Sequence, residues 1–143
     1  MSLLEVLLAI GVSAGILVAV THYYLSTTLS LSVTQSITQI QNDVDASYQW
    51  LQANHQADFQ GDGTTSTPIS LEALQAAGLL PTNAQVNPWG GRVSLGPAPS
   101  QPNFLQISSE QIPTAACIQL SARMQNIAQS AQCVGSHQFI GIF

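Results

Sequence analysis

Met1-Ser2-Leu3-Leu4-Glu5-Val6-Leu7-Leu8-Ala9-Ile10 opens the chain and begins an apolar run that reaches Val20. Glu5 is the only charged side chain in the first 42 residues. An ionised carboxylate at the centre of a membrane-spanning helix costs about 2.5–3.5 kcal/mol, so an acid in such a run needs a partner. The nearest candidate is a free α-amino group at Met1, on this chain or on a neighbouring copy.

Residues 3–20 are apolar apart from Glu5, Gly11, Ser13 and Gly15, and a membrane-spanning helix needs about 20 such residues. No Lys or Arg precedes Arg92, and no small-residue cleavage site follows the run, so the pattern does not fit a signal peptide. We therefore expect the segment to be retained. Gly11 and Gly15 form G-x-x-x-G, which favours either close helix packing in lipid or local flexibility.

A helical stripe continues beyond the apolar run without a proline before Pro68. Its apolar members recur every three or four residues: Leu25, Leu29, Val33, Ile37, Ile40, Val44, Tyr48 and Leu51. The spacing predicts one helix of about 50 residues, on the order of 75 Å long at 1.5 Å per residue. Residues 1–24 form its apolar, membrane or filament-core half, and residues 25–54 form its amphipathic half.

Residues 55–143 are expected to form a globular head of the α+β class, in which the long helix packs on a small antiparallel sheet. Ser70 and Gly78 bound a short helix over residues 71–77. Asn87-Pro88-Trp89-Gly90-Gly91 reads as a turn into a strand. The other predicted elements are strand 92–95, loop 96–102, strand 103–107, helix 115–130 and strand 138–143.

The composition excludes a basic nucleic-acid footprint, because the net charge is −5 and Arg92 and Arg123 are the only basic side chains besides histidine. Charged residues make up 6% of the chain and hydrophobic residues 45%, which argues against disorder. The chain has an even number of cysteines, Cys117 and Cys133, which suggests one disulfide, with two free thiols as the alternative.

No catalytic, metal or cofactor motif is visible in the sequence. Glu72 and Glu110 have no spacing that would bring them together, and the histidines, His22, His55 and His137, show no metal spacing. His22 lies where the apolar run ends, as expected for a polar-tipped ring at a membrane–water interface. Asp58 and Asp62 fit a turn better than a calcium loop. We expect a protein that is not an enzyme and has no cofactor.

Met1-Ser2-Leu3-Leu4-Glu5-Val6, followed by an apolar helix, resembles the N-terminus of a mature type IV pilin. Met at position 1 is similar to the type IVb branch, which includes the toxin-coregulated, bundle-forming and conjugative thin pili. Three later segments also look like that branch: Ala76-Ala77-Gly78-Leu79-Leu80-Pro81, Asn87-Pro88-Trp89-Gly90-Gly91 and Pro113-Thr114-Ala115-Ala116-Cys117.

The resemblance implies a pilin fold and a structural role. Prepilin peptidase would expose Met1, which would then be N-methylated. The pilus assembly machinery would move subunits from the inner membrane into an extracellular helical filament on the bacterial surface. Within that homopolymer Glu5 would face the N-terminal amine of an adjacent subunit, and Cys117–Cys133 would close a D-region over residues 117–133. Filaments of this kind serve adhesion, aggregation, DNA uptake, conjugation or phage reception, and the sequence does not choose among these roles.

The short head favours the major pilin among the proteins that share this N-terminus. The alternatives are a minor pilin, a type II secretion pseudopilin, or a membrane-anchored adhesin that does not polymerise. No direct nucleic-acid contact is expected. The lack of a proline near position 22 leaves Gly11 to Gly15 as the place where the helix would melt during assembly.

Overall fold

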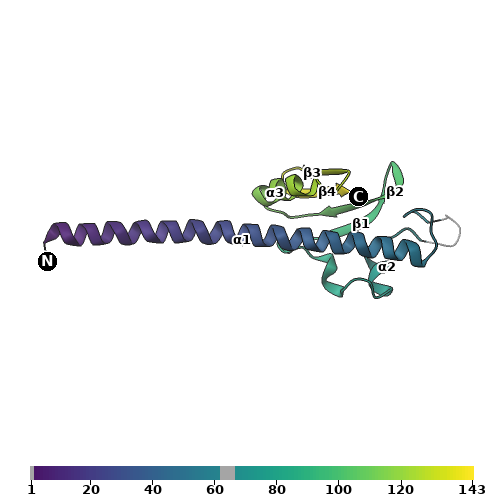
Figure 1. Cartoon of the computed structure of the whole chain (residues 1–143), viewed down its shortest axis with the longest axis horizontal. Coiled ribbons are helices and arrows are strands. Elements are labelled where there is room, and N and C mark those ends of the chain that lie inside the picture. Colours follow the sequence, from purple (N-terminus) through teal and green to yellow (C-terminus); the bar gives the residue numbers. More distant parts are fainter. Residues whose placement is uncertain (1, 62–66) are drawn as a thin grey trace. The chain divides into compact units, whose positions relative to one another are not determined.

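The computed structural model describes residues 2–61 and 67–143 and divides into two compact units, Met1–Leu31 and Ser32–Phe143. The predicted α+β pilin fold is confirmed: a long N-terminal helix packs on a small antiparallel sheet, with short extra helices (Figure 1). The elements are α1 (Leu3–Ala53), α2 (Leu71–Ala76), the 3-10 helix η1 (Thr82–Gln85), β1 (Val93–Ala98), β2 (Gln101–Ser109), α3 (Thr114–Met124), β3 (Ser130–Val134) and β4 (Gln138–Ile142).

The first unit contains only the apolar part of α1. Every residue from Ser2 to Thr28 is exposed, including large apolar side chains such as Leu3 and Leu17. Among the described residues, α1 is the one helix long and apolar enough to cross a membrane. This unit therefore leaves a long apolar surface that no other part of the described chain covers.

The face of α1 that packs in the second unit is rotated from the predicted stripe. Tyr48 is exposed, and Ile37, Val44 and Leu51 are only half-buried. The buried face is made of Val33, Ser36, Ile40, Asp43, Ala46, Ser47 and Trp50. This face contains small and polar residues, such as Ser36 and Ser47, that apolar periodicity does not detect.

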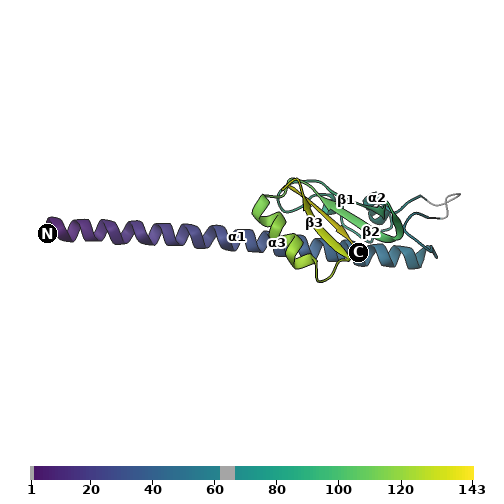
Figure 2. The ribbon, with the colours of Figure 1, turned by 90° about the horizontal axis from the view of Figure 1, so that it is seen from above.

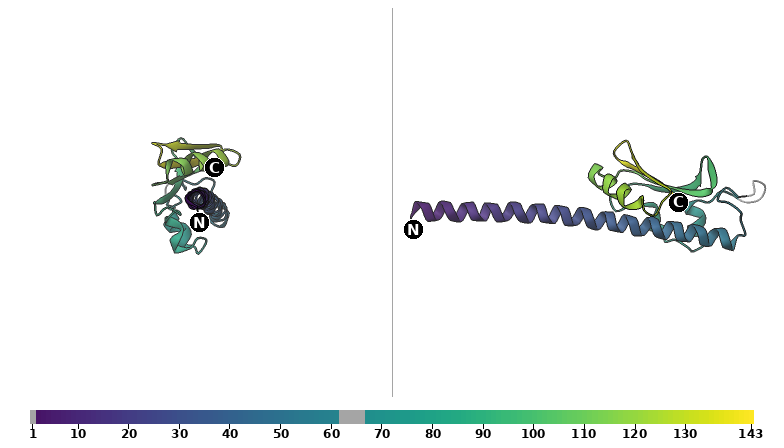
Figure 3. Two further views of the ribbon diagram at one scale, coloured as in Figure 1. Left: turned by 90° about the vertical axis from the view of Figure 1, so that its left-hand side faces the viewer. Right: turned by 45° about the horizontal axis from the view of Figure 1, so that its top comes forward.

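The sheet has the strand order β1-β2-β4-β3, and every neighbouring pair is antiparallel (Figure 2). Alternate residues of its strands point into the core, as the period of two in a strand requires. The buried members are Val93, Leu95, Ala98, Leu105, Ile107, Ser109, Ala131 and Phe139. The strands form one layer, and the second unit also contains α2, η1, α3 and the part of α1 from Ser32 onward (Figure 3).

The predicted loop over residues 96–102 is wrong. Strand β1 continues to Ala98 and β2 starts at Gln101, with a register shift between Pro97 and Ala98. The prolines and Gly96 suggested a loop, but β1 is an edge strand, where a missing N–H removes no ladder bond.

The predicted helix over residues 115–130 is wrong in its second half. Helix α3 ends at Met124, and Ser130 already belongs to β3, a strand that the sequence did not predict. The backbone N–H of Gln129 donates to Ile142 O at 2.8 Å, and residues 130–134 pair along β4. Pairing with a strand that lies later in the chain therefore overrides the local helical preference.

The short helix predicted over residues 71–77 is confirmed with one residue fewer at its end. Ser70 caps it, since its Oγ accepts from the backbone N–H of Ala73 at 3.2 Å. Gly78 has φ +73°, and the N–H of Leu79 donates to Leu74 O, which is a Schellman ending. Met1 and Asp62 lie outside the described residues.

Candidate functional site

The N-terminus of α1 holds Glu5 in a capping box. The backbone N–H of Ser2 donates to Glu5 Oε2 at 3.1 Å, and the backbone N–H of Glu5 donates to Ser2 Oγ at 3.4 Å. This reciprocal arrangement satisfies two of the N–H groups that the first turn of a helix leaves without partners. Glu5 therefore has a partner on its own chain, and the side chain remains exposed.

Sequence reasoning found Glu5 but missed Ser2. The signal was present, because Ser2-Leu3-Leu4-Glu5 is the S-x-x-E pattern of a capping box just before an apolar run. The proposed partner amine of Met1 lies outside the described residues, so pairing between Glu5 and Met1 stays a prediction, as does N-methylation of Met1.

Gly11 and Gly15 lie in the exposed part of α1, which is an unbroken helix through both. A Cβ atom built at either glycine meets nothing within 4 Å. Therefore no other part of the described chain packs against either glycine. Their small size leaves that surface open to another helix, and their role in packing or melting stays a prediction.

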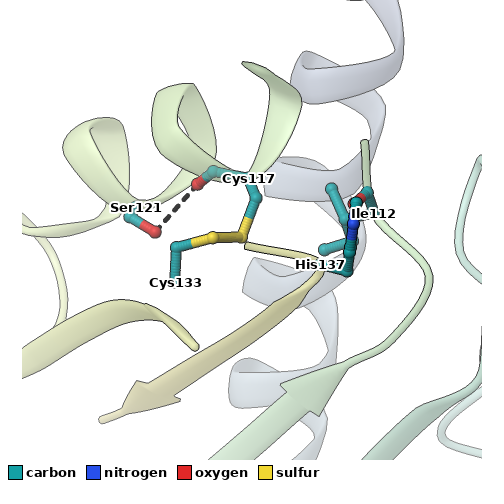
Figure 4. Close-up of a disulfide and its surroundings, with 5 residues drawn as sticks. All are labelled: Ile112, Cys117, Ser121, Cys133 and His137. Carbon is teal, nitrogen blue, oxygen red and sulfur yellow. Dashed lines mark hydrogen bonds between the residues drawn. A yellow bond between two sulfur atoms is a disulfide. The ribbon is translucent and has the colours of Figure 1, made fainter. Parts of the chain in front are cut away.

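Cys117 and Cys133 form a disulfide, with an S–S distance of 1.97 Å and Cα atoms 5.7 Å apart (Figure 4). It joins α3 to β3 and agrees with the D-region that the pilin resemblance implies. Cys117 is fully buried, and Ser121 Oγ donates to Cys117 O at 2.8 Å on the same helix. The bond thus ties the only helix of this region to the strand that the sequence did not predict.

The turn at residues 87–91 is built around the buried side chain of Asn87. Its Oδ1 accepts from the N–H groups of Trp89 and Gly91 at 3.0 and 2.8 Å. Its Nδ2 donates to Ser109 Oγ at 2.8 Å and to Glu110 O at 2.6 Å. One amide therefore satisfies four hydrogen bonds and fixes this turn against the end of β2, as the predicted turn into a strand requires.

Asp43 is an acid in the core that the sequence did not single out. It is 1% exposed on the buried face of α1, and neither carboxyl oxygen has a hydrogen-bond partner within residues 2–61 and 67–143. Burial raises the pKa of Asp43 from 3.8 to about 7. Its only sequence signal was its place three residues after Ile40 on the helical face.

The remaining candidates are dispersed. Glu72 on α2 and Glu110 after β2 are both exposed, as are His22 and His55 on or just after α1. His137 Nδ1 lies 3.1 Å from Ile112 O, beside the disulfide (Figure 4). Asp58 Oδ1 accepts from the N–H groups of Gln60 and Gly61, which makes it a turn residue. Within the described residues, no group of three or more His, Cys, Asp or Glu could hold a metal ion.

Residues 33–142 match the family model described as PilS N terminal, which is related to type IV pilins. The chain belongs to this family. The match covers the amphipathic part of α1, the sheet and the disulfide-closed region, and it begins after the apolar part of α1. No curated protein matches the chain.

Membership of a pilin family makes this a structural protein of the type IV pilin kind. The apolar, exposed N-terminal helix and the disulfide fit a pilin that is anchored in a membrane and assembled on the cell surface.

Proposed function

We propose that the chain is the major subunit of a type IVb-like pilus. Residues 1–24 anchor it in the inner membrane before assembly and form the filament core afterwards, when the head, residues 55–143, lies outside the cell. Prepilin peptidase and the assembly machinery process and extract it. The observation that carries this proposal is the exposed apolar surface of residues 3–20, in which Glu5 is the one charged side chain and which no other part of the described chain covers.

A filament core made of apolar helices needs a device that sets the register, because hydrophobic packing has no direction. In this proposal Glu5 supplies it by pairing with the N-methylated amine of Met1 on the adjacent subunit. The capping box supports this role, since it orders the carboxylate at the end of α1 before a partner arrives. Removing one member of a buried charge pair costs about 3–5 kcal/mol.

Glu5→Gln and Glu5→Ala separate the two roles of this side chain. Glutamine keeps an oxygen that can accept the N–H of Ser2 but carries no charge, whereas alanine loses both. Expressed with the assembly machinery, both variants should fail to form filaments, while wild type forms long homopolymers that cryo-electron microscopy of sheared material resolves.

Normal filaments from Glu5→Gln, with none from Glu5→Ala, would reduce Glu5 to a helix cap and reject the charge pair. Wild-type protein that stays in the membrane without long filaments would instead favour a minor pilin, a type II secretion pseudopilin or a non-polymerising adhesin. Near-ultraviolet circular dichroism of the head controls for folding, because Glu5 lies outside the second unit.

A further inference from the structure

A hollow in the second unit lies between α1 and the segment that contains η1. Its volume is about 440 Å³, within the size range of small-ligand pockets. The α1 wall carries amide and hydroxyl groups, among them Gln35, Thr38 and Asn42. The opposite wall is mostly apolar, with Leu80 and Val86. The hollow therefore combines an apolar side with a row of hydrogen-bonding side chains.

Asp43 lies in the lining of this hollow and is the one polar side chain there whose buried oxygens lack a partner among the described residues. Two of its polar neighbours have hydrogen-bond partners. Gln39 Nε2 donates to Ala84 O and Val86 O at 2.9 and 3.0 Å, and Asn87 makes four hydrogen bonds. A buried polar group without a partner is rare in folded proteins. The carboxyl group of Asp43 is such a group, and the hollow next to this residue is large enough to hold a partner.

For the ionised carboxyl the missing partner is a hydrogen-bond donor, and a positive charge would also offset the burial of the carboxylate. Asp43 is the only titratable residue in the lining. The neighbouring acid, Asp45, lines a different hollow with Phe143, and Glu72 and Arg92 line a third beside β1. A single carboxylate among amides suits one monovalent organic cation better than a divalent metal ion.

We propose that this hollow binds an ammonium or guanidinium group, with Asp43 as its counter-ion. The carboxyl oxygens each expose less than 1 Å². The bound cation can therefore reach them only if the segment of residues 84–86, which Gln39 of α1 holds by hydrogen bonds, moves away from the helix. The group can come from a free amine. It can also come from Arg92 or Arg123 of a second copy, both of which are exposed, and this second source rests on the proposed function.

The first arm tests the chemistry on the full chain as a monomer in detergent. Ethylguanidinium is compared with N-ethylurea, its neutral counterpart of similar shape, by titration of the side-chain ¹³C signals of aspartate. At pH 8, ethylguanidinium should shift the Asp43 signal and raise the unfolding temperature, and N-ethylurea should do neither. Asp43→Asn should abolish the response, and Asp45→Asn should keep it.

The response must also follow the charge of the carboxyl. Because the pKa of Asp43 is about 7, the binding-competent form is abundant at pH 8 and scarce at pH 5. The apparent Kd should therefore be about tenfold or more weaker at pH 5. Equal responses to the two probes, equal responses of wild type and Asp43→Asn, or an affinity that does not change with pH would overturn the proposal.

The second arm distinguishes the sources in assembled filaments. If Arg92 or Arg123 of a second copy fills the hollow, the pKa of Asp43 falls in filaments, and Arg92→Gln or Arg123→Gln restores the monomer value. If a free amine is the ligand, ethylguanidinium still shifts the Asp43 signal in filaments. Binding in the monomer does not depend on polymerisation, so failure of the proposed filament function leaves the first arm valid.

Discussion

Glu5 and Asp43 are acids on the same helix, and their surroundings give them different chemistry. Glu5 is exposed and accepts a hydrogen bond from the backbone of Ser2. Asp43 is buried in the second unit, and its carboxyl oxygens accept no hydrogen bond within the described chain. The first carboxylate lies at an exposed helix end, whereas the second has a raised pKa because burial disfavours its charged form.

The free energy of unfolding should fall as the pH rises toward neutrality. Folding raises the pKa of Asp43 from 3.8 to about 7, so the folded state holds this proton more tightly than the unfolded chain does. Because of this difference in proton binding, the contribution of Asp43 to the free energy of unfolding is fully present below about pH 4. It decreases between about pH 4 and pH 7, and it does not change further above about pH 7. At about 1.4 kcal/mol per pKa unit, the total is on the order of 4 kcal/mol.

Asp43→Asn removes this titration at nearly constant shape. The variant should be more stable than wild type at pH 8, and its stability should lack the decline between about pH 4 and 7. Urea unfolding followed by near-ultraviolet circular dichroism measures both. Asp45→Asn, an exposed change two residues away, is the control and should keep the wild-type curve. A wild-type curve that is flat over this range would contradict the assignment.

At the scale of elements, the start of β1 depends on close backbone contact at Gly91. A Cβ atom there would lie 1.9 Å from Glu110 O and 2.8 Å from Asn87 Nδ2. The N–H of Glu110 also donates to Arg92 O at 2.9 Å, so the two backbone segments are held together on both sides of the glycine. The turn can be formed only if this residue has no side chain.

Gly91→Ala should therefore destabilise the second unit. Overpacking of a buried site costs about 1–3 kcal/mol, and here the clash is with backbone that cannot rotate away. The matched control is Gly96→Ala in β1, where a Cβ atom meets nothing within 4 Å. Chemical unfolding of both variants gives the difference. Equal midpoints for the two alanine variants would show that the contact at Gly91 is not tight in solution.

At the scale of the whole molecule, the disulfide joins the last helix to the last strand pair. Cys117 and Cys133 lie 16 positions apart in the sequence, and the loop between them includes the end of α3 and the start of β3. Cross-linking a loop of this length restricts the unfolded chain, and the chain-entropy relation gives about 3 kcal/mol. The bond thus stabilises the region where local sequence preference and observed structure disagree.

Cys117→Ala with Cys133→Ala should lower the free energy of unfolding of the second unit by about 3 kcal/mol. The double variant avoids a free thiol, and its deficit includes lost packing because Cys117 is fully buried. Reduction of the wild-type protein is the control that keeps both sulfur atoms in place. Unchanged unfolding after complete reduction, verified by mass spectrometry of alkylated thiols, would show that the cross-link does not contribute.

Elements with a strong local signal could be predicted from the sequence. The long helix follows from an apolar run, a periodic stripe and the absence of proline before Pro68. The short helix at residues 71–76 follows from Ser70 and Gly78, and the turn at residues 87–91 from its Asn, Pro and Gly residues. Strand β3 could not be predicted, because Ser130–Val134 is extended only by its pairing with β4.

The sequence by itself determined the apolar helix with its single acid at Glu5, the cysteine pair and the fold class, because each rests on composition or on the period of a local element. The tertiary structure alone decided which face of α1 is buried, where α3 ends, and that Asp43 lies in the core beside a hollow. These depend on contacts between segments far apart in the chain, such as residues 34–43 with residues 80–88, and no local pattern encodes them.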